Sequence, residues 1–272
     1  IGTNSGAITS GTASTTQGSF TVSISVPTNV GEGDMIIFDA NNNSDYGADT
    51  CFIRSRDNGS QITLQTPAAF SYSGEDYIVK RAFNSITAWE SAAPANLVTE
   101  KVVWKGVCYN DGVFAEAVTL GGSTTDATHF KWLTVAEGQR HNGSRYLTTG
   151  VRIEMSNNWE TGVLITDDYS IVEWLQIKST FTNASGISVN GPAPGTQVRN
   201  NLLFCTAGGY GYISDDWDTR AYNNLIYGPW TNGMYLSGGT FAYNNTVYGA
   251  QTGIGAYNSG SCFARNCISL GN

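Results

Sequence analysis

The sequence of 272 residues contains few charged side chains, and this scarcity restricts both its fold and its partners. Only 13% of the residues are Asp, Glu, Lys or Arg, and 14 basic residues stand against 22 acidic ones, for a formal net charge of -8. With 32 glycines, this composition indicates a turn-rich chain with few long helices. It also argues against a nucleic-acid partner, because phosphates need clustered Lys and Arg.

Long apolar runs are missing as well. No stretch reaches the roughly 18 residues of a membrane span, so we expect no membrane insertion. The sequence opens at Ile1 and shows no signal peptide, which suggests a mature or trimmed chain. From the composition we infer an extracellular or cell-surface location.

Cysteine and histidine are too sparse and too scattered for a zinc site. The cysteines are Cys51, Cys108, Cys205, Cys262 and Cys267, and their odd number leaves at least one free or bonded to another chain. We favour buried free thiols over a disulfide, and both over a catalytic thiol. For His141, in the segment QRHNG, a role in a turn is favoured over one as a general base.

A repeat of about 22 residues fills the last third of the chain. It is carried by VRNNLLF, AYNNLIYG, AYNNTVYG and ARNCISLG, in which Asn200, Asn223, Asn244 and Asn266 stand 23, 21 and 22 residues apart. Short β-type runs with this period predict a parallel solenoid in which each repeat is one coil.

Two further features of the repeat support this prediction. A second track of glycines steps by 24, 25, 22 and 20 residues, at Gly162, Gly186, Gly211, Gly233 and Gly253. Neighbouring coils lie about 4.8 Å apart, so like residues form ladders. We therefore expect the four asparagines to stack in one column, to bond their amides along it, and to tolerate the tight bend there. We also expect that replacing Asn223 by Leu destabilises the fold.

The pattern resembles the right-handed parallel β-helix of the pectate-lyase-like superfamily, over roughly residues 95–272. The segments FNSITAWE and STTDATHFKWLTVAEGQRHNG are similar to a stretch found in uncharacterised β-helix proteins of bacteria and phages. The resemblance implies an all-β fold. It does not imply one function, because the superfamily includes lyases, hydrolases, adhesins, tailspikes and structural proteins.

The chain before the repeat divides into two further parts. Residues 1–80 alternate short β-type runs with Gly/Asn/Asp turns, which predicts a small barrel or sandwich. The low-complexity opening of this part predicts a flexible or extended arm. Residues 81–94 contain the one expected helix, SITAWESAA, with Ser85 as N-cap. We expect the parallel β-helix to occupy residues 95–272 and this helix to cover its first coil, with Trp89 as a buried plug.

The densest group of chemically active side chains lies in the loop SDDWDTR. If the protein is an enzyme, the predicted catalytic residues are Asp215, Asp216, Asp218 and Arg220, with Trp217 and Tyr169 stacking on a sugar. Carboxylates can also hold Ca²⁺, and the predicted ligands are Asp167, Asp168, Asp215 and Asp216. The superfamily resemblance implies acidic Ca²⁺ ligands and an Arg or Lys base, for which Arg220 is the matching residue. An ordinary solvated turn explains the same residues and is the favoured interpretation.

A weaker calcium motif is DANNNSD, in which Asp39, Asn41, Asn43 and Asp45 alternate. Ser44 stands where an EF-hand loop needs glycine, and Thr50 stands where it needs an acid. An Asn-rich turn is therefore favoured.

Two classes of function remain. The favoured one is a non-catalytic surface protein: a rigid spacer, adhesin or fibre subunit that can bind glycans. The alternative is a polysaccharide lyase or glycoside hydrolase that uses the loop from Asp215 to Arg220. Self-association through the ends of the β-helix is a further expectation, because an uncapped end exposes unpaired backbone groups.

Overall fold

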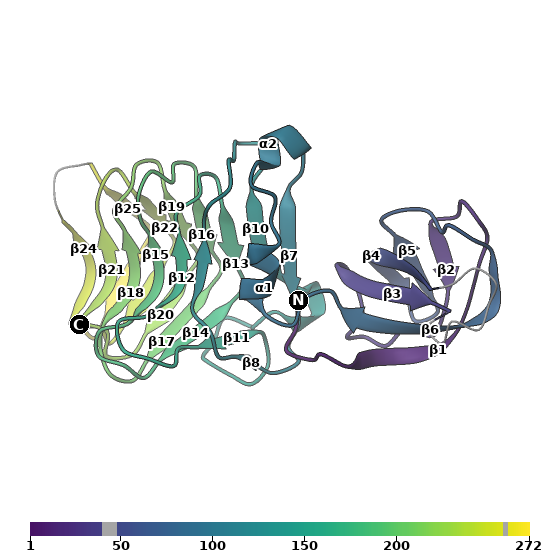
Figure 1. The fold of residues 1–272 in the computed structure, drawn as a ribbon. Helices are drawn as coiled ribbons and strands as arrows, with labels where there is room; N and C mark the ends of the chain where they lie inside the picture. The colour runs from purple at the N-terminus through teal and green to yellow at the C-terminus, as the bar shows by residue number, and fades with distance from the viewer. Residues whose placement is uncertain (40–47, 258–260) are drawn as a thin grey trace. The chain divides into compact units, whose positions relative to one another are not determined.

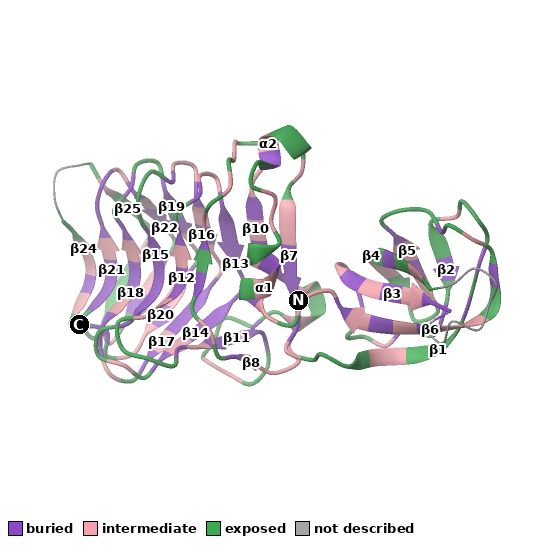
Figure 2. Ribbon diagram, viewed as in Figure 1, coloured by how far each residue is buried: buried purple, intermediate pink, exposed green. Residues whose placement is uncertain are grey.

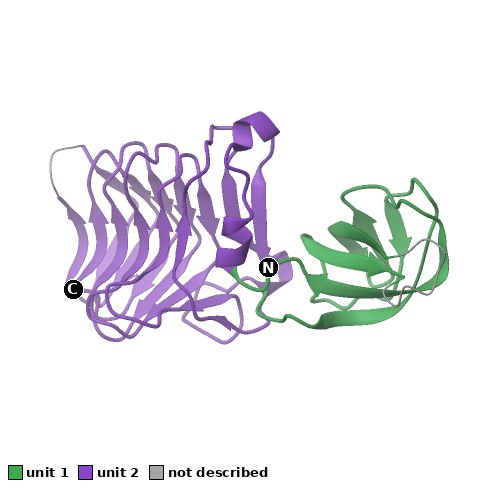
Figure 3. Ribbon diagram, viewed as in Figure 1, with its two compact units in different colours: residues 1–85 green, residues 86–272 purple. Residues whose placement is uncertain are grey.

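The computed structural model describes residues 1–39, 48–257 and 261–272, and it divides the chain into two compact units (Figure 3). The first unit is Ile1–Ser85 and the second is Ile86–Asn272. Asn41, Asn43 and Asp45 of the weaker calcium motif lie outside the described residues.

The first unit is a closed antiparallel barrel with the strand order β1-β2-β5-β4-β3-β6 (Figure 1). Its inward side chains form a core that includes Val22, Ile36 and Ile62. The strands are β1 (Ala7–Thr15), β2 (Thr21–Ser23), β3 (Asp34–Phe38), β4 (Asp49–Asn58), β5 (Gln61–Leu64) and β6 (Tyr72–Arg81).

The opening of the chain, for which we expected a flexible or extended arm, is extended. Residues Ala7–Thr15 form strand β1, which pairs with β6 along its length and with β2 at Ser14. Ala13 and Thr15 are buried in this strand. The low-complexity segment is therefore the strand that closes the barrel, a role that small and β-branched residues can fill.

The described part of the second unit forms three parallel sheets. The first sheet contains β7 (Trp104–Cys108), β10 (Lys131–Val135), β13 (Ile171–Glu173), β16 (Gln197–Arg199), β19 (Arg220–Tyr222), β22 (Phe241–Tyr243) and β25 (Phe263–Arg265). The second contains β8 (Val113–Phe114), β11 (Arg152–Glu154), β14 (Gln176–Ser179), β17 (Leu202–Cys205), β20 (Leu225–Tyr227), β23 (Thr246–Tyr248) and β26 (Ile268–Leu270). The third contains β9 (Val118–Leu120), β12 (Thr161–Ile165), β15 (Ser185–Val189), β18 (Tyr210–Ser214), β21 (Asn232–Leu236) and β24 (Thr252–Ala256).

Each coil of this unit is one strand from each sheet in turn, which confirms the predicted parallel β-helix. The repeats stand one above another, since Val198 pairs with Ala221, and Ala221 with Ala242. These inward residues are at most 1% exposed, and buried segments run through the stacked strands in Figure 2. The spacing of the sequence repeat is thus the length of one coil.

The glycine track marks a place where neighbouring coils touch backbone to backbone. A Cβ atom at Gly211 would lie 2.5 Å from the carbonyl oxygen of Gly233, and one at Gly233 would lie 2.6 Å from that of Gly253. Real Cβ atoms do not approach so closely. Glycine recurs at this position because the next coil leaves no room for a side chain.

The asparagine column is confirmed, but its hydrogen bonding differs from the prediction. Asn200, Asn223 and Asn244 share a left-handed backbone with φ of 56°, 57° and 55° at the corner between the first and second sheets. The amides that bond from coil to coil belong to the following asparagines: Asn201 Nδ2 donates to Asn224 Oδ1 at 3.2 Å, and Asn224 Nδ2 donates to Asn245 Oδ1 at 3.0 Å. The reason is the bend itself, which turns the side chain after it into the core.

Two short helices precede the coils: α1 (Ile86–Ser91) and α2 (Leu97–Glu100). A 3-10 turn at Glu137–Gln139 lies within the coils, between β10 and β11. Helix α1 contacts β7 and β9. Its Trp89 is 2% exposed and stacks on Trp104 at 6.5 Å between ring centroids, as expected for a plug. The Glu116 carboxylate caps the helix by accepting from the backbone N–H groups of Ile86 and Thr87 at 2.8 and 3.0 Å.

All five cysteines are free thiols. Cys108 is fully buried, and burial raises its pKa to about 12, which makes it unreactive. Cys267 occupies the place of the inward asparagine in its coil, and its Sγ accepts a hydrogen bond from Asn245 Nδ2 at 3.9 Å. Within the described residues, no helix has both the length and the apolar character needed to cross a membrane.

Candidate functional site

The predicted site lies at the corner where each third-sheet strand passes to the next first-sheet strand. Tyr169, Gly195 and Asp218 occupy equivalent places in three successive coils, with φ of 57°, 73° and 56°. Their backbones are connected, since Tyr169 N donates to Pro194 O at 2.8 Å and Gly195 N donates to Asp218 O at 3.1 Å. The corner is therefore a rigid stack rather than a set of independent loops.

A pocket of about 300 Å³ opens at this corner, and we call it the corner pocket. Its lining residues are Ala127, Phe130, Tyr169, Ile171, Gly195, Gln197, Asp218 and Arg220. Three residues predicted from the sequence thus come together from two separate segments. The ring of Tyr169 lies against the backbone of Gly195, where an added Cβ would come within 2.4 Å of the ring.

The polar side of the corner pocket is an ion pair at its rim. Arg220 donates to Asp218 at 3.2 Å, and the two side chains are 49% and 50% exposed. A pair this exposed contributes little to stability, about 0–1 kcal/mol. Its donors and acceptors are available to a ligand.

Trp217 is held out into solvent beside this pair. The residue is 67% exposed, and its backbone N–H donates to Asp216 Oδ1 at 2.6 Å. The other oxygen of Asp216 accepts from the backbone N–H of Ala193 in the preceding coil, and Asp216 is only 5% exposed. Asp216 therefore fixes the turn that presents Trp217, while Asp215 is exposed and accepts from Ser237 Oγ at 3.3 Å.

Asp167, two coils earlier, belongs to a buried ion network. Lys131 Nζ lies 2.9 Å from Asp167 Oδ2 and 2.6 Å from Glu90 Oε1, and it donates to Gly121 O at 2.7 Å. The Lys131 side chain is 1% exposed. The lysine already compensates the charge of Asp167, and the network joins helix α1 to the first coils.

Asp168 is the carboxyl with the more unusual environment. Burial raises its pKa above the ordinary value of 3.8, and the negative charges of Asp216 and Asp167 raise it further. A carboxyl whose pKa is raised near a second carboxylate is a feature of sites that use acid catalysis. The catalytic roles predicted for Asp215, Asp216, Asp218 and Arg220 stay predictions.

The residues that form the wall of the corner pocket were not predicted from the sequence. Ala127 and Phe130 come from the loop between β9 and β10, and Asp126 fixes this loop by accepting from the backbone N–H groups of Thr128 and His129, both at 2.7 Å. These bonds, led by the one from Thr128, hold the pKa of Asp126 well below its usual range. The Asp126–Thr128 spacing of an Asx turn was a signal for this loop, but not for its place beside Tyr169.

A second exposed tryptophan was also missed. Trp159 is 78% exposed with φ of 66°, at the corner between the second and third sheets. Glu160 holds its turn by accepting from the backbone N–H groups of Ser156 and Asn157, both at 3.0 Å.

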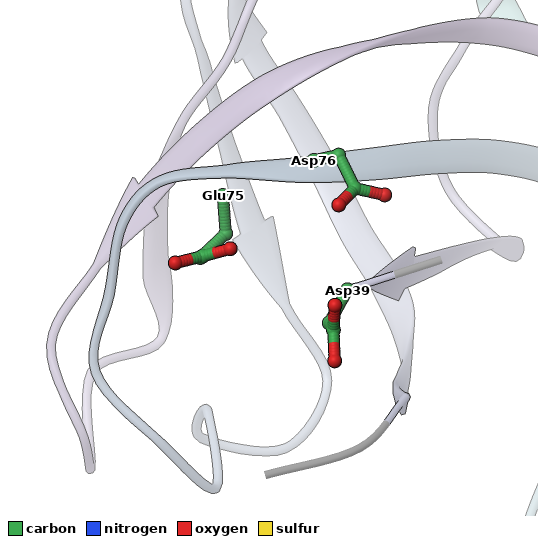
Figure 4. Close-up of side chains that lie close together, drawn as sticks. All are labelled: Asp39, Glu75 and Asp76. Atoms are coloured by element: carbon green, nitrogen blue, oxygen red, sulfur yellow. The ribbon is translucent and has the colours of Figure 1, made fainter. Parts of the chain in front are cut away.

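Three carboxylates gather in the barrel. Asp39, just after β3, lies close to Glu75 and Asp76 of β6, with oxygen atoms all within 4.8 Å (Figure 4). Among the described residues, these three carboxylates are close enough together to bind one metal ion. Ca²⁺ prefers oxygen ligands of this kind. Calcium binding by Asp167, Asp168, Asp215 and Asp216 stays a prediction.

Comparison with known proteins gives limited results. No protein-family model and no curated protein matches the sequence. Among solved structures, the chain is similar to the Gp54 tailspike of Acinetobacter baumannii bacteriophage AP22, solved with A. baumannii capsular saccharide, at 12% identity and a TM-score of 0.22, over 89% of this chain and 45% of that one. It is also similar to the tailspike protein gp49 of Pseudomonas phage LKA1, at 13% identity and a TM-score of 0.22, over 92% and 46%.

The chain thus spans less than half the length of these structures. Its own strand pairing establishes the fold, and on that basis the chain is a parallel β-helix repeat protein with an N-terminal barrel.

Proposed function

We propose that this protein is a non-catalytic, glycan-binding β-helix of an extracellular or cell surface, and that the corner pocket holds the sugar. The observation that carries the proposal is the meeting of the Tyr169 ring with the exposed Asp218–Arg220 pair in one pocket. Sugars combine apolar C–H faces with hydroxyl groups, so an aromatic ring beside charged donors and acceptors suits them. Trp217 supplies a second exposed aromatic surface next to the pair.

Rigidity supports a binding role. The corner residues are fixed by backbone bonds between coils, and Asp216 holds the turn of Trp217. A surface that is ordered before binding loses less entropy when the ligand arrives. Ligand recognition through loops on a rigid scaffold is a common use of repeat folds.

Binding to a panel of plant, algal and bacterial polysaccharides tests the proposal. We expect Arg220→Ala to weaken the affinity for a bound glycan about tenfold, the equivalent of about 1.4 kcal/mol, because a charge-assisted hydrogen bond is lost. Trp217→Ala should weaken it as well. Trp159→Ala is the matched control, since Trp159 is also exposed, at 78% against 67% for Trp217, but lies at another corner. Unchanged binding by both Arg220→Ala and Trp217→Ala would contradict the proposal.

Glycan cleavage is the second candidate, and the raised pKa of Asp168 beside Asp216 is the observation that favours it. In that case Asp168 supplies a proton and residues of the loop from Asp215 to Arg220 assist. Reducing ends released from the same panel, with Ca²⁺ and with a chelator, measure this activity. Cleavage that Asp168→Asn abolishes, in a variant that still binds the glycan, would replace the non-catalytic proposal.

A further inference from the structure

A second groove, of about 380 Å³, runs along the corner between the first and second sheets. This is a different corner from the one that carries the corner pocket. Six asparagines line the groove: Asn142, Asn200, Asn201, Asn223, Asn224 and Asn244. We call it the asparagine groove.

The outward asparagines of this groove have unused hydrogen-bonding groups. No hydrogen bond joins the side chains of Asn200, Asn223 or Asn244 to any residue that the structure describes, whereas the inward Asn201 and Asn224 bond to the next coil. Asn223 and Asn244 are exposed and Asn200 is half-buried. Each carboxamide offers two donor hydrogens and an acceptor oxygen to a ligand.

These carboxamides are held at a fixed spacing. The backbone N–H groups of Asn200, Asn223 and Asn244 each donate to a carbonyl of the next coil at 3.1 Å, and all three residues share the left-handed conformation. Successive coils repeat at about 4.8 Å, so the three amides form a row about 10 Å long. A chain of ring-sized units laid along the row can meet one amide after another.

The loop between β10 and β11 also lines the groove, through His141, Asn142 and Gly143. Nε2 of His141 in this loop donates to Asn200 O at 2.8 Å, and Nδ1 accepts from Gly143 N–H at 3.1 Å. The bond to a carbonyl places the proton on Nε2, and burial lowers the pKa of His141. The imidazole is therefore neutral, and both of its nitrogens are in use.

The lining residues thus carry amides, the Thr246 hydroxyl and apolar surface but no ionised side chain. Outside the lining, the Arg140 guanidinium lies 4.8 Å from the centre of the Trp174 ring. Leu225 and Trp174 supply the apolar part. A charged ligand would give up its hydration without gaining an opposite charge, which is unfavourable. A ligand with hydroxyl groups and C–H surface loses little, because each carboxamide can pair with hydroxyls both as donor and as acceptor.

From these observations we propose that the asparagine groove binds an uncharged oligosaccharide, in a site separate from the corner pocket. The outward asparagines are then binding residues as well as corner residues.

Affinity electrophoresis in gels that contain dextran, galactomannan or xyloglucan tests this proposal, with alginate as the charged comparison. The variant is the double substitution Asn223→Gly and Asn244→Gly, because glycine keeps the left-handed backbone while the side chain with its carboxamide is removed. Asn266→Gly is the matched control, since Asn266 has the same conformation, with φ of 52°, but does not line the groove. Thermal unfolding of each variant shows that the fold is kept.

We expect at least one neutral polysaccharide to retard the protein, and the double variant to bind it at least tenfold more weakly. Asn266→Gly should bind normally. Because neither Asn223 nor Asn244 lines the corner pocket, a loss of binding in the double variant distinguishes this site from that pocket. The proposal is overturned if none of the three neutral polymers retards the protein, or if the double variant binds as strongly as the wild type.

Discussion

At the scale of the residue, two asparagines stand side by side in three of the coils and serve different purposes. The first of each pair makes the bend, and the second turns inward and bonds to the next coil, as Asn223 and Asn224 show. Asn224 uses its whole amide: Oδ1 accepts from Asn201 N at 3.0 Å, and Nδ2 donates to Val198 O at 2.9 Å. Its carboxamide replaces the hydrogen bonds that water would otherwise make.

Substitution separates the two roles. We expect Asn224→Leu to lower the free energy of unfolding by about 1–3 kcal/mol relative to the wild type, because its buried partners lose their hydrogen bonds. Asn223→Leu acts only through the bend, where a residue other than Gly or Asn costs roughly 1–2 kcal/mol. Urea denaturation of both variants measures the difference. An Asn224→Leu variant as stable as the wild type would contradict this assignment.

Asp168 gives a prediction for pH. The folded state binds the proton of Asp168 more tightly than the unfolded state does, because burial and the charges of Asp216 and Asp167 raise its pKa above 3.8. The contribution of Asp168 to stability is thus present below that value and is lost as the pH rises through the raised pKa. We expect Asp168→Asn to match the wild type in stability at about pH 3 and to exceed it at about pH 7. Chemical denaturation at the two pH values decides this, and a variant less stable at neutral pH refutes it.

The position of the asparagine column could be predicted from the sequence, but the directions of its side chains could not. The repeat predicted the column of Asn200, Asn223 and Asn244, because position in a period is visible in the sequence. It did not distinguish the outward from the inward asparagine, since both stand in every NN pair and only the bend decides their directions. The pairing of Lys131 with Asp167 was not predicted, because the path of the coils brings together residues that are far apart in the sequence.

At the scale of the element, backbone contact between third-sheet strands restricts side-chain size. We expect Gly211→Ala to destabilise the fold by about 1–3 kcal/mol, because the added methyl group would overlap Gly233 O and the Ile226 side chain, each 2.5 Å away. Gly138→Ala is the control, since a Cβ there meets nothing within 4 Å. Thermal or urea unfolding measures both, and equal effects would show that the strands separate easily.

Helix α1 is attached to the coils through charge as well as through Trp89. Lys131→Met should cost about 3–5 kcal/mol, because it leaves Glu90 and Asp167 as uncompensated charges. Asp218→Ala removes an exposed pair instead and should cost at most about 1 kcal/mol. Denaturation curves of the two variants provide the comparison. If Lys131→Met lowered the free energy of unfolding by less than Asp218→Ala does, the network would contribute nothing to stability.

At the scale of the whole molecule, the two units have separate cores. The barrel core is built from residues of Ile1–Ser85 alone, and all seven tryptophans follow Ser85. Tryptophan fluorescence therefore reports only on the β-helix unit, while circular dichroism reports on both.

We expect the fragment 1–85 to fold and to unfold cooperatively by itself, because its barrel is closed and its core is complete. Circular dichroism during heating of the isolated fragment measures this. A sloping, non-cooperative curve would show that the barrel depends on the rest of the chain.

The common register of the coils makes the length of this molecule adjustable in whole steps. Removing residues 201–223 joins Asn200 to Asn224, so one bend again precedes one inward asparagine, and Ala242 takes the place of Ala221 opposite Val198. The cross-section of the solenoid is unchanged by such a deletion, although Asp218 and Arg220 are removed. Reach and recognition are therefore separable in this architecture: the number of coils sets how far the protein extends, and the corners of particular coils set what it holds.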